Sequence, residues 1–411
     1  MNRREWLRHA GMLSASTLVA IGTHGWATRT NAQTSPMANS KRLIVIFLRG
    51  AVDGLSVVVP YQEAVYYNAR PKIAIPQPGK EGGALDLDGQ FGLHPALSDL
   101  MPLWKQGSLA FVPASGSPDP SRSHFDAQDN MESGTPGMKK TSDGWMNRLL
   151  AVMSGRNPIQ AVNVGATTPR ILSGRMAVAS IALGRGAANA IPLDRPQVAA
   201  AFDKLYDRND TLSQTYRDGR AARKALLQDL DAETKMANNG APLPNGFASD
   251  ARRLANVMLR DPKVELAFMA LGGWDTHVNQ GSSQGQLARN LNQLGKGLAA
   301  LQAGLGSAYA NTTIVVMSEF GRTVYENGNG GTDHGHGNVM WVIGGSVRGG
   351  KIYGKWDGLG SDRLYQGRDV PVTTDFRDVI GNVLDRHMGL DRTKLAQVFP
   401  GYTPGKAVSV V

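Results

Sequence analysis

The sequence contains no cysteine among its 411 residues. This absence excludes disulfides, thiolate zinc sites, iron–sulfur clusters and cysteine nucleophiles. Any bound metal must therefore be held by histidine, aspartate, glutamate or other oxygen ligands. Charged residues are also few, at 19%, against 41% apolar residues. Such a composition is typical of a chain that buries a core and not of a disordered chain.

A concentrated basic region is absent as well. The formal charge of +10 invites a nucleic-acid partner, but the basic residues are scattered. The sequence contains no lysine or arginine tract and no aromatic-plus-basic module of the kind that recognises RNA. We therefore expect no nucleic-acid partner, and we expect the positive charge to favour an anionic small-molecule substrate or an envelope surface.

The first 32 residues have the order of a secretory signal. Arg3 and Arg4 precede an aromatic residue and a leucine, an uncharged segment runs from Ala10 to Gly22, and Ala27 and Ala32 offer small residues for cleavage. The arginine pair resembles a twin-arginine signal, and the uncharged segment is too short to span a bilayer comfortably. We predict a cleaved signal at 1–32, a periplasmic or secreted location and no transmembrane anchor in the mature chain. The alternative is a basic N-terminus on a cytosolic protein.

Apolar runs of strand length alternate with helical segments along most of the remaining chain. Leu43 to Leu48 is a continuous apolar run, which is typical of a strand buried on both faces of a parallel sheet. Similar runs predict strands at 109–112, 160–164, 263–271 and 339–343 and from Thr312, and intervening segments predict helices. From about 167 to 260 the pattern becomes mainly helical and highly charged. We predict a single α/β domain over 41–411 with a helical insertion at about 167–260.

Potential metal ligands follow several of the predicted strands. In open α/β sheets, ligands bind where the carboxyl ends of the strands meet. Two of the candidates leave one strand end two residues apart, so on an extended segment they would face the same way. The set comprises Asp53, Asp275, His277, Glu319, His334 and His336. It suits one or two divalent ions, such as Zn²⁺ or Mn²⁺. The alternative is that these residues only stabilise glycine-rich loops.

The turn after the strand at 109–112 supplies a second group of candidates. Either Ser121 or Ser123 can cap a helix that runs toward Glu132. The free N–H groups at a helix start form an anion site, which Arg122 would reinforce. His124 lies in the same turn. Two other histidines have other contexts: His94, near a helix start, indicates a packing or capping residue, and His387 indicates a surface or helix-end residue.

Several blocks in fixed order resemble one bacterial exported family. These blocks are the Arg3-Arg4 pair, LIVIFLRGAVDGLS, SRSHFDAQD, GGWDTH, SEFGRT and DHGHGN. Together they resemble the family called domain of unknown function 1501, which is placed in the alkaline phosphatase-like superfamily with sulfatases and cofactor-independent phosphoglycerate mutases. The resemblance implies a mixed, largely parallel sheet flanked by helices and a divalent-metal site at the strand carboxyl ends.

The resemblance also implies roles for individual residues. Asp53 matches the first-strand metal aspartate of the superfamily, the pair Asp275 and His277 resembles its central Asp-plus-His pair, and His334 resembles its late histidine. Glu319 stands where an aspartate is usual. The following position, Phe320, departs from the pattern, because it normally supplies a histidine ligand. One metal position is weakened unless His336 substitutes for that histidine.

A second departure concerns the nucleophile. Pro120, Ser121 and Arg122 resemble the end of the sulfatase motif Cys/Ser-x-Pro-Ser-Arg, but its nucleophile position is Pro118. A sulfatase mechanism as such is therefore excluded. Ser121 or Ser123 is the alternative nucleophile, with a metal lowering its pKa, unless both serines are simply helix caps.

These observations lead to two functional hypotheses. The first is an exported metal-dependent hydrolase, or transferase, of phosphate or sulfate esters, in which Arg122 and Arg322 bind the anion. The second is a non-catalytic periplasmic binding or assembly protein with a degenerate site, which Phe320 and Pro118 favour. The family resemblance implies a possible exported protein partner in that case.

Overall fold

The computed structural model describes residues 40–138, 141–153, 159–165, 168–181, 196–208, 210–214, 217, 246–405 and 408–411. Ser40 to Val411 form one compact unit. The predicted signal at 1–32 lies outside the described residues, as does part of the predicted helical insertion, including 182–195 and 218–245.

The centre of this unit is a sheet of nine strands in the described residues, in the order β11-β5-β10-β9-β1-β8-β6-β7, with β12 also paired to β5. The strands are β1 (Arg42–Leu48), β5 (Leu109–Gly116), β6 (Ala161–Val164), β7 (Ala179–Ile181), β8 (Leu266–Leu271), β9 (Thr312–Ser318), β10 (Asn338–Gly344), β11 (Lys351–Ile352) and β12 (Thr374–Asp375). Of the described strands of this sheet, only β10 runs antiparallel to its neighbours. This mixed, mostly parallel sheet flanked by helices confirms the predicted fold class.

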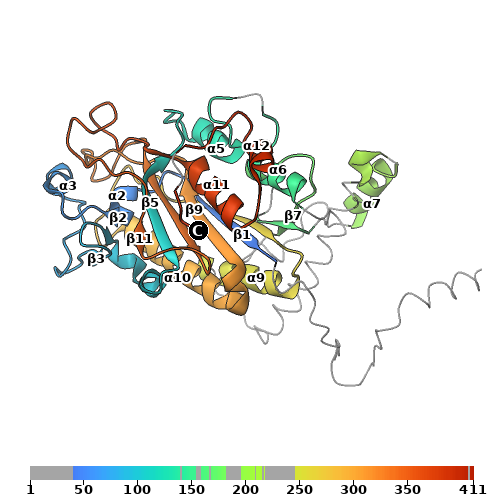
Figure 1. Cartoon of the computed structure of the whole chain (residues 1–411), viewed down its shortest axis with the longest axis horizontal. Coiled ribbons are helices and arrows are strands. Elements are labelled where there is room, and N and C mark those ends of the chain that lie inside the picture. Colours follow the sequence, from blue (N-terminus) through green and yellow to red (C-terminus); the bar gives the residue numbers. More distant parts are fainter. Residues whose placement is uncertain are drawn as a thin grey trace, which may run out of the picture. The chain divides into compact units, whose positions relative to one another are not determined.

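Helices cover both faces of the sheet (Figure 1). One face packs against η2 (Pro95–Leu100), α4 (Met101–Lys105), α9 (Phe247–Arg260) and α10 (Gln286–Leu305). The other face packs against α5 (His124–Ser133), α6 (Trp145–Val152), α11 (Phe376–Arg386) and α12 (Arg392–Val398). Strand β1 serves both cores because successive side chains point to opposite faces: Ile44 and Ile46 belong to the first core, and Val45 and Phe47 to the second.

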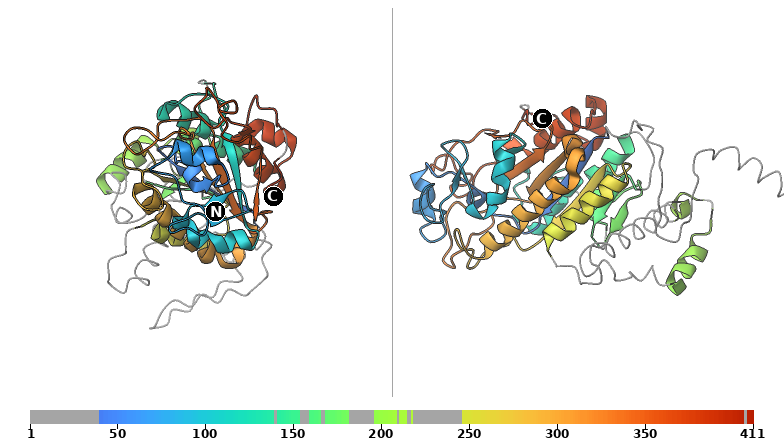
Figure 2. Two further views of the ribbon diagram at one scale, coloured as in Figure 1. Left: turned by 90° about the vertical axis from the view of Figure 1, so that its left-hand side faces the viewer. Right: turned by 90° about the horizontal axis from the view of Figure 1, so that it is seen from below.

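The described residues also contain smaller elements. They are α2 (Gly54–Val57), α3 (Ala64–Ala69), η3 (Arg170–Leu172), α7 (Pro196–Leu205), η6 (Gly306–Asn311) and a three-stranded sheet of β2 (Val58–Val59), β4 (Gly92–Leu93) and β3 (Leu85–Asp86). Within the range predicted as a helical insertion, β7 extends the central sheet and α9 packs against it along α10 (Figure 2). None of the helices in the described residues has the length and apolarity needed to cross a bilayer.

Two histidines have the structural roles that their contexts predict. His94 caps η2, where its Nδ1 accepts a hydrogen bond from the Ala96 N–H at 3.0 Å. His387 ends α11, and its Nε2 donates to the Arg42 carbonyl at 2.9 Å. Burial lowers the pKa of each imidazole to about 4, so both rings are neutral structural groups at neutral pH.

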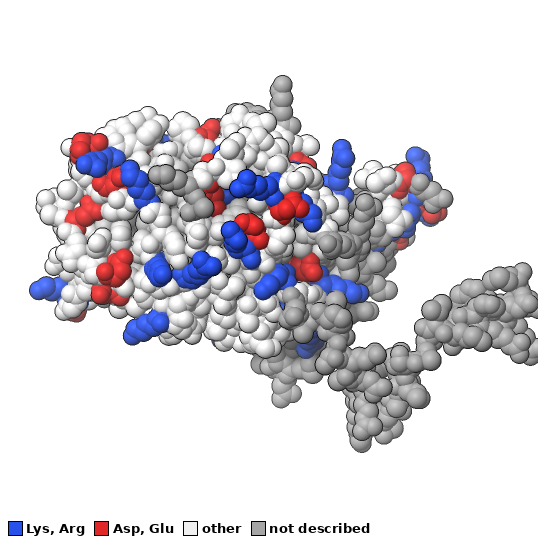
Figure 3. All heavy atoms as spheres, in the orientation of Figure 1, with Lys and Arg blue, Asp and Glu red and all other residues white. Residues whose placement is uncertain are grey.

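On the face drawn in Figure 3, basic and acidic side chains are interspersed over the described surface. The arrangement on this face agrees with the scattered charges of the sequence.

Candidate metal centre

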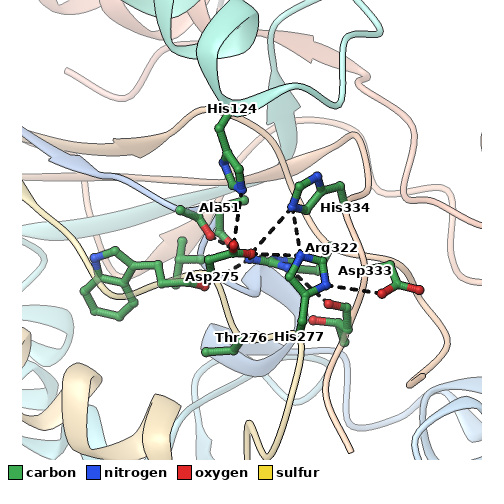
Figure 4. A network of polar contacts seen from close by, with 12 residues as sticks. Ala51, His124, Asp275, Thr276, His277, Arg322, Asp333 and His334 are labelled. Carbon is green, nitrogen blue, oxygen red and sulfur yellow. Dashed lines mark hydrogen bonds and ion pairs between the residues drawn. The ribbon is translucent and has the colours of Figure 1, made fainter. Parts of the chain in front are cut away.

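The carboxylate of Asp275 lies among three imidazole rings (Figure 4). Its Oδ1 is 3.0 Å from Nε2 of His277 and 3.5 Å from Nε2 of His334. Its Oδ2 is 3.6 Å from Nε2 of His124. The Nε2 atoms of His277 and His334 are themselves only 3.0 Å apart. We call these four residues the Asp275 cluster. The Asp275 side chain is 46% exposed, so the cluster is open to solvent on one side.

The sheet brings these four residues together because its parallel strands end at one edge. Asp275 and His277 follow β8, and His334 lies in the loop that leaves β9, which is two strands from β8 with β1 between them. His124 comes from the opposite side of the site, as the first residue of α5 after the loop that leaves β5. The structure thus brings together three of the candidates that follow predicted strands, Asp275, His277 and His334.

Each of the three rings is fixed by its other nitrogen. Nδ1 of His124 lies 2.8 Å from a Glu319 oxygen, Nδ1 of His277 lies 3.2 Å from an Asp333 oxygen, and Nδ1 of His334 lies 2.8 Å from the Arg122 carbonyl. A carbonyl or ionised carboxylate can only accept, so each Nδ1 carries the hydrogen. In the neutral ring, Nε2 is then a lone pair directed into the cluster. Metal-bound histidines are held in this way.

The three imidazole rings and the Asp275 carboxylate, with hydrogen on each Nδ1, carry no positive charge of their own. With hydrogen on each Nδ1, the lone pairs of His277 and His334 face each other at 3.0 Å and both face the Asp275 carboxylate. Nε2 of His124 is buried and has no hydrogen-bond partner among the described residues. Lone pairs and a carboxylate repel one another at these distances. A cation, either a proton or a metal ion, is therefore needed to hold the four groups together.

Arg322 supplies part of that charge from beneath the cluster. Its guanidinium is 1% exposed and donates from Nη2 to Oδ1 of Asp275 at 2.6 Å. Its remaining donors bind backbone carbonyls, including those of Ala51 and Thr332. Partial burial by itself would raise the pKa of Asp275, but the Arg322 hydrogen bond and charge outweigh it and lower the pKa. Asp275 is therefore held as a carboxylate.

Glu319 orients His124 and is not part of the converging set. Gln128 and His124 lie one helical turn apart on α5, and both donate to the same oxygen of Glu319, Gln128 at 2.9 Å. Burial alone would raise the pKa of Glu319, but the hydrogen bonds from His124 and Gln128 lower it overall. In return, the hydrogen bond to Glu319 raises the pKa of His124, whereas burial lowers the pKa of His334.

The structure does not bring Asp53 into the cluster. Its side chain is fully buried, and its two oxygens accept from Arg70 at 2.6 and 3.1 Å. Ser56 and Gln280 each donate to it at 2.7 Å. Burial alone would raise the pKa of Asp53, but the charge and hydrogen bonds of Arg70 lower it. Here Asp53 is one half of a buried ion pair whose oxygens are already occupied.

His336 also lies apart from the Asp275 cluster. Its ring is buried against Tyr365, with centroids 4.7 Å apart, and burial lowers its pKa. The position where the resemblance implies a histidine ligand is filled by Phe320, whose ring packs against His124 and His334 at centroid distances of 5.0 and 4.9 Å. In this arrangement His336 does not replace the missing ligand.

The two serines have the helix-cap role that the sequence left as an alternative. Oγ of Ser123 accepts from the Asp126 N–H at the start of α5, and Oγ of Ser121 accepts from the Ser123 N–H at 3.3 Å. Arg122 pairs with Asp369 through its side chain. Among the described contacts, neither serine hydroxyl touches the cluster, and Arg122 reaches it only through its backbone carbonyl.

Sequence reasoning missed several residues that support the cluster. Asp333 directly precedes His334 and could have been noticed as a carboxylate in the same loop. Arg70, Gln128 and Asp369 carry no motif or strand-end signal, and their roles follow only from contacts made in the folded chain.

The family described as "Protein of unknown function (DUF1501)" matches residues 40–399 of the chain. The chain therefore belongs to this family, as the sequence blocks indicated. A search of curated proteins finds no match.

Solved structures resemble the chain at low sequence identity. The C-terminal periplasmic domain of EcEptC from Escherichia coli, in complex with Zn, is 11% identical, with a TM-score of 0.40 and coverage of 91% of this chain and 93% of that one. The lipoteichoic acid synthase LtaP from Listeria monocytogenes is 8% identical, with a TM-score of 0.34 and coverage of 95% and 79%. An alkaline phosphatase from the Antarctic bacterium TAB5 is 13% identical, with a TM-score of 0.29 and coverage of 74% and 92%. At these TM-scores no property of the site follows from the similarities.

Proposed function

We propose that the chain is a metal-dependent hydrolase of phosphate or sulfate esters, with a divalent ion held by the Asp275 cluster. The observation that carries this proposal is the set of three Nε2 lone pairs and one carboxylate that face one another without a sufficient positive charge. The ligand set contains nitrogen and oxygen only, which suits Zn²⁺ and also permits Mn²⁺.

The spacing of these atoms supports the proposal. Zinc–nitrogen and zinc–oxygen bonds of 2.0–2.2 Å in a tetrahedral site place neighbouring ligand atoms roughly 3.3 Å apart. The four contacts inside the cluster measure 3.0, 3.0, 3.5 and 3.6 Å. His124, Asp275 and His334 have ligand atoms all within 4.8 Å of one another, and His277 contacts this group through Asp275 and His334.

A divalent ion at this point would supply Lewis acidity for ester hydrolysis and would lower the pKa of water. The protein contributes the rest of the site. Asp275 and the three histidines would hold the ion at the solvent-exposed side of the cluster. Glu319 orients the His124 ring toward the cluster. Because both serines are engaged in the α5 turn, we assign the attack to water.

The anion would be recognised mainly by the bound ion. Arg122 is engaged with Asp369, and Arg322 is buried with its donors on Asp275 and backbone carbonyls. We therefore propose that Arg322 acts through Asp275, by keeping it ionised, and that it does not contact the ester group itself.

The test is metal content and turnover of the purified protein. We expect about one zinc or manganese ion per chain, and hydrolysis of aryl phosphates or aryl sulfates that a chelator abolishes and added metal restores. Asp275→Asn and His334→Gln should lose both metal binding and hydrolysis. His336→Gln should keep both, because His336 is in the same loop but lies outside the cluster. The proposal fails if the wild-type protein binds no divalent ion, or if it binds one that His334→Gln retains.

A second candidate function is a binding or assembly protein of the cell envelope. It is favoured by Phe320, which fills the place of a ligand, and by the absence of a serine hydroxyl from the described contacts of the cluster. In that case a stoichiometric exported partner should co-purify equally well with wild type and Asp275→Asn, and no esterase activity should accompany it.

We also propose export through the twin-arginine pathway to the periplasm. The support is the order of Arg3-Arg4, uncharged segment and small residues in the leader. Replacing both arginines with lysine should retain the protein in the cytoplasm, as measured by cell fractionation. Unchanged fractionation would argue against the pathway.

A further inference from the structure

Asp369 joins two arginines inside the protein. The residue is fully buried, and each carboxylate oxygen accepts from one guanidinium: Oδ1 from Nε of Arg368 at 3.0 Å and Oδ2 from Nε of Arg122 at 3.1 Å. The turn that carries Asp369 is closed by the Tyr365 N–H, which donates to the Asp369 carbonyl at 2.8 Å. The turn also lies beside Thr323, with which Asp369 forms an antiparallel bridge.

Both arginines also hold His334, from opposite ends of the residue. The carbonyl of Arg122 accepts from Nδ1 of the His334 ring at 2.8 Å. The guanidinium of Arg368 donates from Nη2 to the His334 backbone carbonyl at 2.6 Å. One buried carboxylate thus links a contact that sets the ring orientation to a contact that sets the backbone position. The three segments meet only in the folded chain, since Arg122 is 247 residues from Asp369.

This carboxylate restricts both arginines, and Gln366 is a further acceptor for Arg122, at 2.8 Å. The Arg368 side chain is 42% exposed and the Arg122 side chain 28% exposed, and long exposed side chains lose considerable rotamer entropy when they are fixed. A buried carboxylate that accepts charge-assisted hydrogen bonds from both offsets that cost. Replacing Asp369 would release both contacts to His334 at once.

We propose that Asp369 is a positioning residue for the metal centre, which fixes the ring and backbone of His334 through Arg122 and Arg368. This inference rests on the proposed function, in which His334 is a ligand. It does not place Asp369 in contact with the ion or the substrate. Supporting residues of this kind alter metal affinity by about 10- to 100-fold when they are replaced.

Three variants of the full chain test the inference. Asp369→Asn removes the charge from the centre of the network. Arg368→Met removes only the exposed arm, so it should leave the fold intact even if Asp369→Asn does not. Arg363→Met is the matched control, because Arg363 is 56% exposed in the same loop and pairs only with the adjacent Asp362 in the described contacts. Thermal unfolding of the chelated proteins identifies the variants that remain folded.

Two measurements read the position of His334. Zinc affinity, determined by competition with a chelator, should fall about 10-fold or more in Arg368→Met and in folded Asp369→Asn and should not change in Arg363→Met. In the metal-free protein labelled with ¹⁵N-histidine, His334 should be the Nδ1-protonated tautomer in wild type and Arg363→Met, and a tautomer mixture in the other two variants. Its signals can be assigned from a His334→Gln sample.

The outcomes separate this inference from the proposed function. If wild type binds zinc but Arg368→Met keeps both its affinity and its His334 tautomer, the positioning role is overturned. If wild type binds no zinc, the proposed function fails, and the tautomer measurement still decides whether Asp369 and Arg368 position His334. A tautomer change with lower zinc affinity supports both.

Discussion

Replacement of Arg70 by methionine should be among the most damaging single changes outside the Asp275 cluster. Arg70 and Asp53 are both fully buried and share two hydrogen bonds, of 2.6 and 3.1 Å. Arg70 also donates to the carbonyls of Thr323 and Val324, each at 2.8 Å. These two carbonyls lie in the loop between β9 and β10 that also contains His334, so the ion pair connects the end of β1 to the loop of the candidate site.

The expected cost follows from these contacts. Breaking a buried ion pair by removing one partner costs about 3–5 kcal/mol, because the other charge remains buried. Two backbone carbonyls lose charged donors, at about 1 kcal/mol each or more. We expect Arg70→Met to lower the free energy of unfolding by roughly 5 kcal/mol or more, which is comparable to the whole stability of a marginal domain. Asp53→Leu with Arg70→Met should be more stable than Arg70→Met alone, because no uncompensated charge remains.

The assay is urea unfolding of wild type, both single variants and the double variant, with a chelator present so that metal binding does not contribute. A loss of under about 1 kcal/mol in Arg70→Met would refute the reasoning, since breaking a buried pair costs several times more. Asp53→Asn adds a second readout. From the contacts described here, we expect its folded fraction to keep the metal, whereas a variant of a true ligand would lose it.

Three further predictions concern the site and the fold. Glu319→Gln should lower the pKa of His124, because its largest raising cause is removed, and should weaken zinc binding about 10- to 100-fold, measured by NMR titration and chelator competition; equal affinities would contradict the assigned role. Gly331→Ala should weaken zinc binding, since its Cβ would lie 2.4 Å from the His277 carbonyl, whereas Gly328→Ala, with nothing within 4 Å, should not; equal loss in both would argue against the steric cause. For His387, the pKa of about 4 in the folded state lies below the unfolded value of 6.5, so the unfolded state binds more protons between these values. The neutral His387 ring therefore contributes about 3 kcal/mol to the free energy of unfolding above pH 6.5, and this contribution is lost as the pH falls toward 4. His387→Gln should reduce the decrease in the free energy of unfolding, measured with urea, between pH 7 and pH 4.

The sequence predicted the sheet well because its signals are local. In a continuous apolar run such as Leu43 to Leu48, the side chains on both faces of the strand are apolar and must be buried. This run forms the central strand β1. The same logic proposed Asp275, His277 and His334, which lie close together in the structure, since residues just past parallel strands share one edge. It could not separate them from Asp53, because the direction of that side chain depends on Arg70 and Gln280, which the strand pattern does not connect to it.

The loop from Gly331 to His336 shows the same limit at closer range. His334 and His336 are two residues apart and equal as sequence signals, yet only His334 joins the cluster. The difference comes from partners supplied elsewhere: Arg122 and Arg368 hold His334 inward, whereas Tyr365 packs on His336. A periodic pattern specifies which element a residue belongs to, but the choice between two such histidines is made by tertiary contacts.

Phe320 and Asp53 together bear on how many ions the site can hold. Each stands at a position where the family resemblance implies a ligand, but Phe320 offers no donor atom and Asp53 has its oxygens occupied by Arg70, Ser56 and Gln280. Phe320 instead packs its ring against both His124 and His334. A ring fixed by a hydrogen bond at Nδ1 and by an aromatic wall has little freedom left, so Phe320 removes a potential ligand while it narrows the orientations of two others. The residues that converge in the described structure therefore form one centre. His124, Asp275 and His334 have ligand atoms within 4.8 Å of one another, His277 contacts Asp275 and His334, and no second set of this kind occurs among the described residues.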